Sequence, residues 1–240
     1  MMKKVAISFL LVASLPFLVG TTSCGQEAPR GHILTTEDIN DLIDSERERM
    51  NNAHVMAEAA RALGYSEMHT IIMTAKQEYE YSEGIIASYN SMLSERQRAK
   101  EKEYPMASQV WNYFEQAGWS APVIAGIIGN MMAETAGGTL GLNPYVYGAG
   151  GYYYGLCQWN KSAFPGVFGT NVEEQCSFLL NTIEQEFDTY GSVYGITYGD
   201  FLALGSAYEA GVYFSKVYER GGNHYIRGTY AEEAYVYFTT

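Results

Sequence analysis

Residues 36–103 form a long segment that is polar, charged and almost free of residues that end a helix. Apolar side chains recur along its first part at helical spacing, and these are Ile39, Leu42, Ile43, Val55, Met56, Ala59, Ala60 and Leu63. The sequence LGYS at residues 63–66 is typical of a turn, and a second helical run begins near Glu67. The segment is therefore predicted to fold as an α-helical hairpin, with Thr36 capping its first helix.

The predicted hairpin offers no catalytic motif. Its two histidines, His54 and His69, are expected on different helices, and no metal-ligand spacing such as HExxH is present. We interpret both as surface or packing residues, and the many charges as a solvated face. The hairpin is expected to serve as a spacer or as a docking segment for an envelope protein.

The first residues have the order of a bacterial export signal. Two lysines precede an apolar run over residues 5–20, which Pro16 interrupts and which is short for the ~20 residues of a spanning helix. Residues 1–23 are therefore predicted to be a signal peptide. Cys24 follows TTS, a context that resembles the lipoprotein cleavage box, with ordinary signal peptidase cleavage as the alternative. The predicted location is the cell envelope, with a membrane-anchoring lipid on Cys24 and a linker over residues 24–35.

The composition changes sharply at Tyr104. From this residue onward the chain carries 17 of its 21 tyrosines, and Lys plus Arg fall to four against twelve Asp plus Glu. The formal net charge of the whole chain is -12, which argues against a surface that binds nucleic acid phosphates. We therefore predict a separate domain over residues 104–240 and no nucleic-acid partner. No metal-ligand motif is visible, and no cofactor is expected.

A helical run with one acidic residue marks the candidate site of this domain. In VIAGIIGNMMAET, residues 123–135, apolar side chains form a stripe, and Asn130 and Glu134 lie four residues apart on an adjoining face. Glu134 is in the last turn, where burial and the negative end of the helix dipole both disfavour a charged carboxylate. Its pKa is therefore expected to be raised, which suits a general acid. The ordinary alternative is a solvated glutamate or one paired with an arginine.

Residues 143–162, NPYVYGAGGYYYGLCQWNKS, are crowded with glycine and tyrosine. Aromatic rings with polar tips are the kind of side chain that grips sugar rings, although aromatic richness is also compatible with packing alone. Tyr154 and Trp159, the latter beside Gln158, are the candidate sugar contacts. Trp119, by contrast, is expected in the core.

Four segments of this region resemble, in the right order, the signature segments of the tail-associated lysozyme family of bacteriophages. They are AGIIGNMMAET, YGLCQWN, NVEEQCSFLLNTIEQEF and AYEAGVYFSKVYERGG. Each segment is weak alone, but the four together are fairly specific. The resemblance spans residues 104–238, essentially the whole second region.

The resemblance implies a mainly α, lysozyme-like catalytic domain that follows the hairpin and cuts the β-1,4 glycan backbone of peptidoglycan. By position, Glu134 corresponds to the proton donor. The cleft residues that it implies are Gly155, Leu156, Gln158 and Trp159, and Asn130 falls on the motif's asparagine. Thr135 and Tyr154 are further candidate substrate contacts. Thr135 stands where a serine often follows the acid, a mild departure that keeps a hydroxyl group. Cys157 is a larger oddity beside a cleft.

A second catalytic carboxylate is not singled out by any motif. Glu219, Asp200 and Glu173 are all candidates, and for Glu219 an ion pair with Arg220 at a helix end near Arg227 is favoured. Some lysozyme-like enzymes work with a single glutamate. The sequence therefore leaves hydrolase and lytic transglycosylase open, with the hydrolase favoured.

Other assignments for this region compete with the glycosidase. Cys157 and His224 would be the pair of a thiol peptidase, the least favoured alternative because no third orienting residue is apparent. Cys157 and Cys176 would instead form a disulfide in an oxidising compartment. A domain that has lost catalysis and only binds peptidoglycan or an envelope protein is the more serious alternative.

Overall fold

The computed structural model describes residues 34–67 and 69–240, and residues 35–240 form one compact unit. The predicted signal peptide, the lipidation site Cys24 and most of the predicted linker over 24–35 lie outside the described residues. Within the described ranges, no helix has the length and apolar character needed to cross a membrane.

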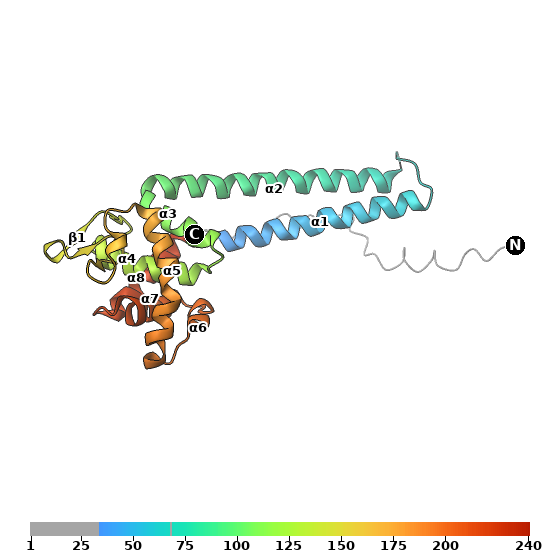
Figure 1. The fold of residues 1–240 in the computed structure, drawn as a ribbon. Coiled ribbons are helices and arrows are strands. Elements are labelled where there is room, and N and C mark those ends of the chain that lie inside the picture. The colour runs from blue at the N-terminus through green and yellow to red at the C-terminus, as the bar shows by residue number, and fades with distance from the viewer. Residues whose placement is uncertain (1–33, 68) are drawn as a thin grey trace. The chain divides into compact units, whose positions relative to one another are not determined.

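Two long helices, α1 (Thr36–Ala62) and α2 (Thr70–Glu103), lie side by side as the predicted hairpin (Figure 1). The cap of α1 is Thr35 rather than Thr36. The hydroxyl oxygen of Thr35 accepts from the Asp38 amide at 3.0 Å, and the Asp38 carboxylate accepts from the Thr35 amide at 2.7 Å, which makes a capping box. His69 caps α2, because its Nδ1 accepts from the Ile71 amide at 3.3 Å.

The apolar seam between α1 and α2 is narrower than the sequence pattern suggests. Its buried residues are Ile39, Ile43, Ala53, Ala57 and Ala60 on α1 and Ile72, Ala75 and Ser82 on α2. Val55 and Leu63, which belong to the predicted apolar face, are 56% and 59% exposed. Steps of three and four residues separate most neighbouring buried positions, the spacing of a coiled-coil seam.

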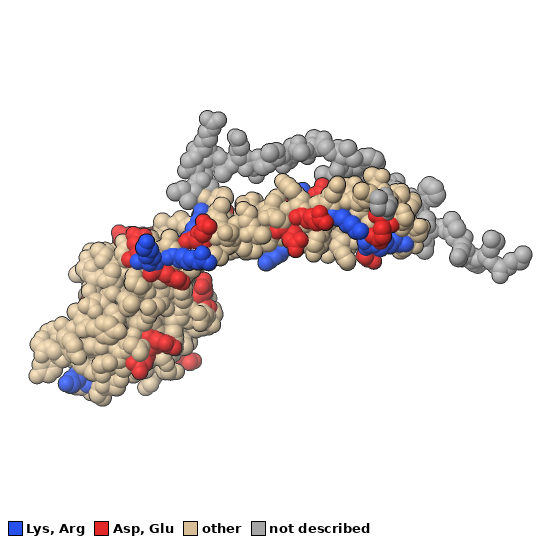
Figure 2. Space-filling model, turned by 90° about the horizontal axis from the view of Figure 1, so that it is seen from above, with Lys and Arg blue, Asp and Glu red and all other residues tan. Residues whose placement is uncertain are grey.

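Charged side chains gather on the hairpin, whereas the face of the C-terminal domain seen in Figure 2 carries few of them. Arg49 pairs with Glu46 and Glu78, and Arg61 pairs with Glu58 and Glu67. Pairs of this exposed kind contribute only about 0–1 kcal/mol each. The charges therefore form a solvated surface more than a source of stability.

The C-terminal region is mainly α, as predicted. Its helices are α3 (Pro105–Gln116), α4 (Ala121–Thr135), α5 (Val172–Tyr190), α6 (Tyr198–Leu202), α7 (Ala207–Phe214) and α8 (His224–Thr239). Three two-residue strands, β1 (Tyr147–Gly148), β2 (Tyr153–Tyr154) and β3 (Trp159–Asn160), form an antiparallel sheet in the order β1-β2-β3. Short turns complete it: η1 (Ala149–Gly151), η2 (Pro165–Val167), η3 (Gly191–Tyr194) and the π-helical η4 (Ser215–Glu219).

Glycines let α4, α7 and α8 pack unusually closely. A Cβ atom on Gly126 would lie 2.7 Å from the carbonyl carbon of Ala210 on α7. One on Gly129 would lie 2.7 Å from the Cα of Ala231 on α8. Real Cβ atoms do not come this close to backbone, so glycine is required at both positions. This contact brings the end of α4 against the start of α8.

The end of α2 is bonded to the end of α8. Lys100 donates to the Phe238 carbonyl oxygen at 2.7 Å, and the Tyr237 hydroxyl donates to the Glu103 carboxylate at 2.9 Å. Burial lowers the pKa of Lys100, and the carbonyl groups at the negative end of α8 favour a cation there. The hairpin is thus attached to a helix that also contributes to the candidate site.

Candidate active site

Glu134 lies in the last turn of α4, where the sequence places it, with 20% of its side chain exposed. The Arg227 guanidinium on α8 donates to its Oε1 through Nη2. An arginine partner is the alternative that the sequence analysis left open. Glu134 is therefore an ion-paired side chain at the end of α4.

Asn130 holds Arg227 in place rather than facing a substrate. It is fully buried, and its Nδ2 donates to the carbonyl oxygens of Gly126 and Gly211, both at 2.9 Å. Its Oδ1 accepts from Arg227 Nη1 at 3.3 Å, and Arg227 Nε donates to the Gly222 carbonyl oxygen at 3.3 Å. The prediction that Asn130 binds substrate is therefore wrong for this conformation, because the side chain is enclosed by three helices.

Glu219 is the last residue of the π-helical turn η4, and its carboxyl group interacts with Glu134 and Arg227. The extra residue in such a turn re-aims the side chains that follow it, and π-turns are frequent at functional sites. Arg220, directly after Glu219, adopts a left-handed conformation with φ 49° and turns away. It pairs with Glu186 and lies over the Tyr190 ring. The ion pair expected between Glu219 and Arg220 is thus wrong.

The environment of Glu219 favours its neutral form. Its Oε1 is buried and has no hydrogen-bond partner among the described residues. Burial, and then the negative charge of Glu134, raise the pKa of Glu219 to about 8, against smaller opposing effects of Arg227, the Cys157 thiol and Arg220. A carboxyl group that holds its proton near neutral pH is therefore present in this cluster.

The other two carboxylates considered from the sequence lie in different environments. Asp200 accepts from the Thr197 hydroxyl and amide at the start of α6, and these bonds lower its pKa. Glu173 is exposed in the first turn of α5. Of the three candidates, Glu219 is the one that interacts with Glu134.

Cys157 and Cys176 are both buried free thiols, so the disulfide considered from the sequence is absent from the structure. The Cys157 thiol interacts with the Glu219 carboxyl group, and burial raises the pKa of the thiol well above the ordinary value. Burial also raises the pKa of Cys176 to about 12. A thiol held neutral in this way is a poor nucleophile.

The pair expected for a thiol peptidase is not assembled. His224 Nδ1 contacts the Ser215 hydroxyl oxygen at 2.8 Å, and Cys157 is next to Glu219 rather than next to this imidazole. Burial lowers the pKa of His224. The peptidase alternative is therefore wrong for the conformation described, since the nucleophile and its base are bonded to other groups.

The family model for phage tail lysozyme matches residues 105–238, more than half of the chain. The chain belongs to the phage tail lysozyme family. The family supports a peptidoglycan-lytic enzyme of the glycosidase kind, with peptidoglycan as its substrate. The comparisons with curated proteins and with solved structures gave no match.

In this phage tail lysozyme domain, the GLCQW segment lies next to the acid cluster, the name used here for Glu134, Glu219, Arg227 and Asn130, because its Cys157 interacts with Glu219. Gly155 has φ 78°, and the neighbouring Leu156 amide donates to Gln175 Oε1 at 2.8 Å. Gln158 is half-buried, and its Nε2 donates to the Gly155 carbonyl oxygen at 3.0 Å. These bonds hold the turn between β2 and β3. The Gln158 amide nitrogen therefore donates to backbone carbonyl oxygens and is not free to bind a sugar.

Trp159 and Tyr154 are packing residues of the lysozyme domain, which corrects their prediction as sugar contacts. Trp159 is 3% exposed, and its indole N–H donates to the Tyr218 hydroxyl at 3.0 Å. Tyr154 is 2% exposed, and its hydroxyl donates to the Thr170 carbonyl oxygen at 2.9 Å. Both rings face the core from the same side of the sheet because Tyr154 on β2 and Trp159 on β3 are cross-strand partners. Trp119, expected in the core, is half-buried and stacks on Phe114.

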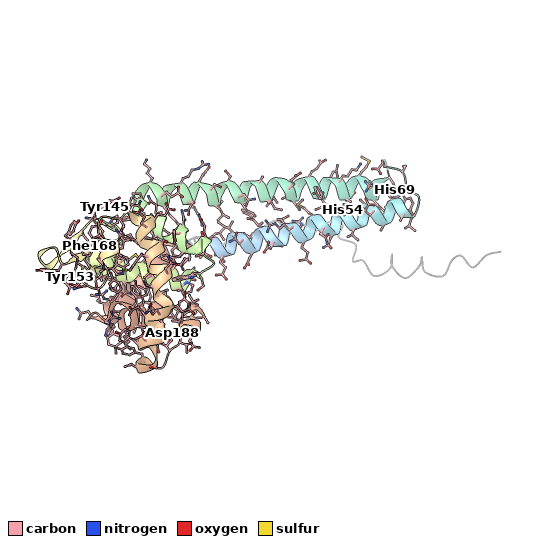
Figure 3. The ribbon with its side chains drawn as sticks, in the orientation of Figure 1. His54, His69, Tyr145, Tyr153, Phe168 and Asp188 are labelled. Carbon is pink, nitrogen blue, oxygen red and sulfur yellow. The ribbon has the colours of Figure 1, made fainter. Side chains whose placement is uncertain are left out.

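The exposed aromatic surface lies on the tyrosines around these two residues. Tyr145, Tyr147, Tyr152 and Tyr153 are 57%, 60%, 64% and 38% exposed. Figure 3 shows Tyr145, Tyr153 and Phe168 in this part of the domain, away from His54 and His69 on the hairpin. Strand alternation in YYY could have separated the outward Tyr153 from the inward Tyr154, had the strand been recognised.

Thr135 ties this aromatic loop to the helix that carries the acid. Its hydroxyl donates to the Met131 carbonyl oxygen at 2.9 Å and accepts from the Asn143 amide at 3.3 Å. Asn143 begins the tyrosine-rich segment. Thr135 therefore positions the loop relative to Glu134, and its hydroxyl hydrogen is already used.

Proposed function

We propose that this protein is an exported peptidoglycan glycosidase in which Glu134 is the catalytic acid. The observation that carries the proposal is the match to the phage tail lysozyme family over a domain in which Glu134 lies in the last turn of α4 and interacts with a second carboxyl group, Glu219. In this reaction a carboxylic acid protonates the glycosidic oxygen as the bond between that oxygen and the anomeric carbon breaks. Water then adds to the anomeric carbon in a hydrolase.

The contacts proposed for the glycan are the exposed tyrosines of this segment, Tyr145, Tyr147, Tyr152 and Tyr153. Tyrosine rings stack on the apolar faces of sugars, and their hydroxyl groups bond to sugar hydroxyls. A neutral, aromatic contact of this kind also suits a domain with only four Lys and Arg residues, because it does not depend on charge attraction to an anionic polymer.

The proposed setting is the cell envelope, with residues 1–23 as signal peptide and a lipid on Cys24 as membrane anchor. The hairpin then separates the anchor from the enzyme and offers a surface for an envelope protein. Its shallow hollow, lined by residues that include His54, Ala57 and Tyr79, is one place for such a contact. Co-purification of an envelope protein that is lost on deletion of residues 36–103 would support this role, and unchanged recovery would contradict it.

Digestion of purified peptidoglycan, with the released fragments analysed by mass spectrometry, tests the activity, the bond and the product together. Fragments with reducing muramic acid ends are expected for the hydrolase that we favour. Anhydro ends would instead identify a lytic transglycosylase, in which a hydroxyl of the same sugar takes the place of water. A protein that binds peptidoglycan but releases nothing would be the binding module, and the enzymatic proposal would be wrong.

A further inference from the structure

Two carboxyl groups in the acid cluster face one guanidinium, and only one of them is bonded to it. Arg227 donates to Glu134, to Asn130 and to the Gly222 carbonyl oxygen. Glu219 receives no hydrogen bond from it, and Oε1 of Glu219 is buried without a partner. A charged carboxylate buried in this way is costly, whereas a neutral carboxylic acid is much less so. These contacts thus favour the neutral form of the Glu219 carboxyl group.

The other groups around Glu219 do not change this assignment. Arg220, the next residue, is engaged by Glu186 on α5. The Cys157 thiol and the Tyr218 hydroxyl both interact with Glu219, and burial raises the pKa of each, so both are neutral. With Glu134 on α4 and Arg227 on α8, these are the titratable groups that influence it. One proton on Glu219 leaves the two carboxyl groups and Arg227 electrically balanced.

We propose that Glu134 and Glu219 share one proton and act together as the acid of the proposed glycosidase, with Glu219 as the residue that holds the proton at rest. Cys157 positions Glu219 through its thiol. Two carboxyl groups that disfavour each other's ionisation are a known way to keep one of them protonated near neutral pH. The inference rests on the proposed function, in which Glu134 contacts the glycosidic oxygen.

The cleavage step consumes and returns one proton. The proton of the pair moves to the glycosidic oxygen, and that oxygen takes the electron pair of its bond to the anomeric carbon. Both carboxyl groups are then charged beside Arg227. Water, or a sugar hydroxyl in a transglycosylase, adds to the anomeric carbon and returns its proton to the pair. No other reactant is needed.

The test replaces Glu219 with Gln and with Asp and follows the rate of peptidoglycan digestion against pH. The parent enzyme is expected to lose activity as the pH rises through about 8. Glu219→Gln is expected to lower the rate about 100-fold, the usual size of an acid-base contribution, and to remove this alkaline limb. Glu219→Asp restores part of the rate and an alkaline limb, which a merely structural role would not do. Glu173→Gln, at an exposed carboxylate, is the matched control and keeps the parental profile.

A second measurement needs no substrate and separates this inference from the proposed function. In protein labelled with 13C at the glutamate side-chain carboxyl carbons, the Glu219 signal, assigned by its loss in Glu219→Gln, is expected to titrate near pH 8. Titration below about pH 6, or a Glu219→Gln variant with the parental rate and pH profile, would overturn the shared-proton pair. Absence of digestion by the parent would contradict the proposed function, while the titration would still decide where the proton lies.

Discussion

Arg227 connects the residues of the acid cluster. Its side chain is 10% exposed and contacts Glu134 and Asn130 from α4 and the backbone of the turn before α8. Its planar guanidinium can serve these three acceptors at once, which an ammonium group cannot do with the same geometry. Side chains of α4 and the backbone of the turn before α8 are therefore joined through one side chain.

Replacing Arg227 with Met is expected to lower the free energy of unfolding by roughly 2–4 kcal/mol, because Glu134 and Asn130 Oδ1 lose their partner in a largely buried place. Chemical denaturation at neutral pH measures the change. The matched control is Arg47→Met on the hairpin, whose ion pair with Asp44 is exposed on both sides. We expect a change within about 0.5 kcal/mol there. Equal changes in the two variants would show that the contacts of Arg227 stabilise the fold no more than an exposed ion pair does.

Glu219 gives a prediction for the pH dependence of stability. Its pKa of about 8 in the folded protein lies above the ~4.3 of an unfolded glutamate, so between these values the folded state holds a proton that the unfolded state has released. The free energy of unfolding therefore falls as the pH rises through this window, by on the order of 2–4 kcal/mol. Denaturation of parent and Glu219→Gln at pH 5 and pH 9 measures it. The variant is expected to gain stability relative to the parent at pH 9, and an unchanged difference would contradict the assignment.

At this scale the sequence predicts the position of Glu134 but not its surroundings. The helical spacing and the motif place the acid at the end of α4, whereas nothing local indicates that Arg227, 93 residues later, is its partner. The sequence favours Trp159 and Tyr154 as sugar contacts, because an aromatic-rich segment does not show which of its rings are buried. It favours an ion pair between Glu219 and Arg220, because the π-helical turn that directs the two side chains apart has no clear sequence signal.

The packing of α4 against α7 and α8 is the element-level feature that assembles the site. It depends on glycines in helix interiors. Glycine has a low helix propensity and so lowers the stability of a helix, but it permits close approach of the two backbones. Gly129 packs against the backbone of Ala231, and Ala231 lies one turn after Arg227 on α8. Any side chain at this position would push the two helices apart at the acid cluster.

Gly129→Ala is expected to destabilise the protein by about 1–3 kcal/mol, the usual cost of overpacking, despite the better helix propensity of alanine. Gly84→Ala on α2 is the control, because a Cβ there meets nothing within 4 Å. That variant is expected to gain about 0.5–1 kcal/mol. Thermal and urea unfolding of both proteins would check the pair, and a stable Gly129→Ala protein would refute the close-packing argument.

The larger elements were easier to predict than the short ones. Periodicity over dozens of residues indicated the hairpin, although the buried seam is narrower because Val55 and Leu63 face outward. The two-residue strands and the five-residue helix α6 are too short for periodicity to reveal. Their positions follow from tertiary bonds, such as that between Leu156 and Gln175, which link segments distant in the sequence.

For the whole molecule, the structure combines a charged hairpin with a weakly charged, tyrosine-rich lysozyme domain. The two are bonded where α2 meets the end of α8, through Lys100 and Tyr237. The same helix α8 begins near the acid cluster with Arg227. A protein that binds the hairpin would therefore act on a domain whose helix α8 joins the hairpin to the candidate site.

The central claim is that Glu134 provides the acid for glycan cleavage. Its most direct test is the initial rate of soluble fragment release from purified peptidoglycan by Glu134→Gln and by the parent protein at equal concentration. Gln keeps the shape but cannot supply a proton, so a loss of about 100-fold or more is predicted, with folding checked by circular dichroism. A Glu134→Gln protein that digests peptidoglycan as fast as the parent would contradict the account.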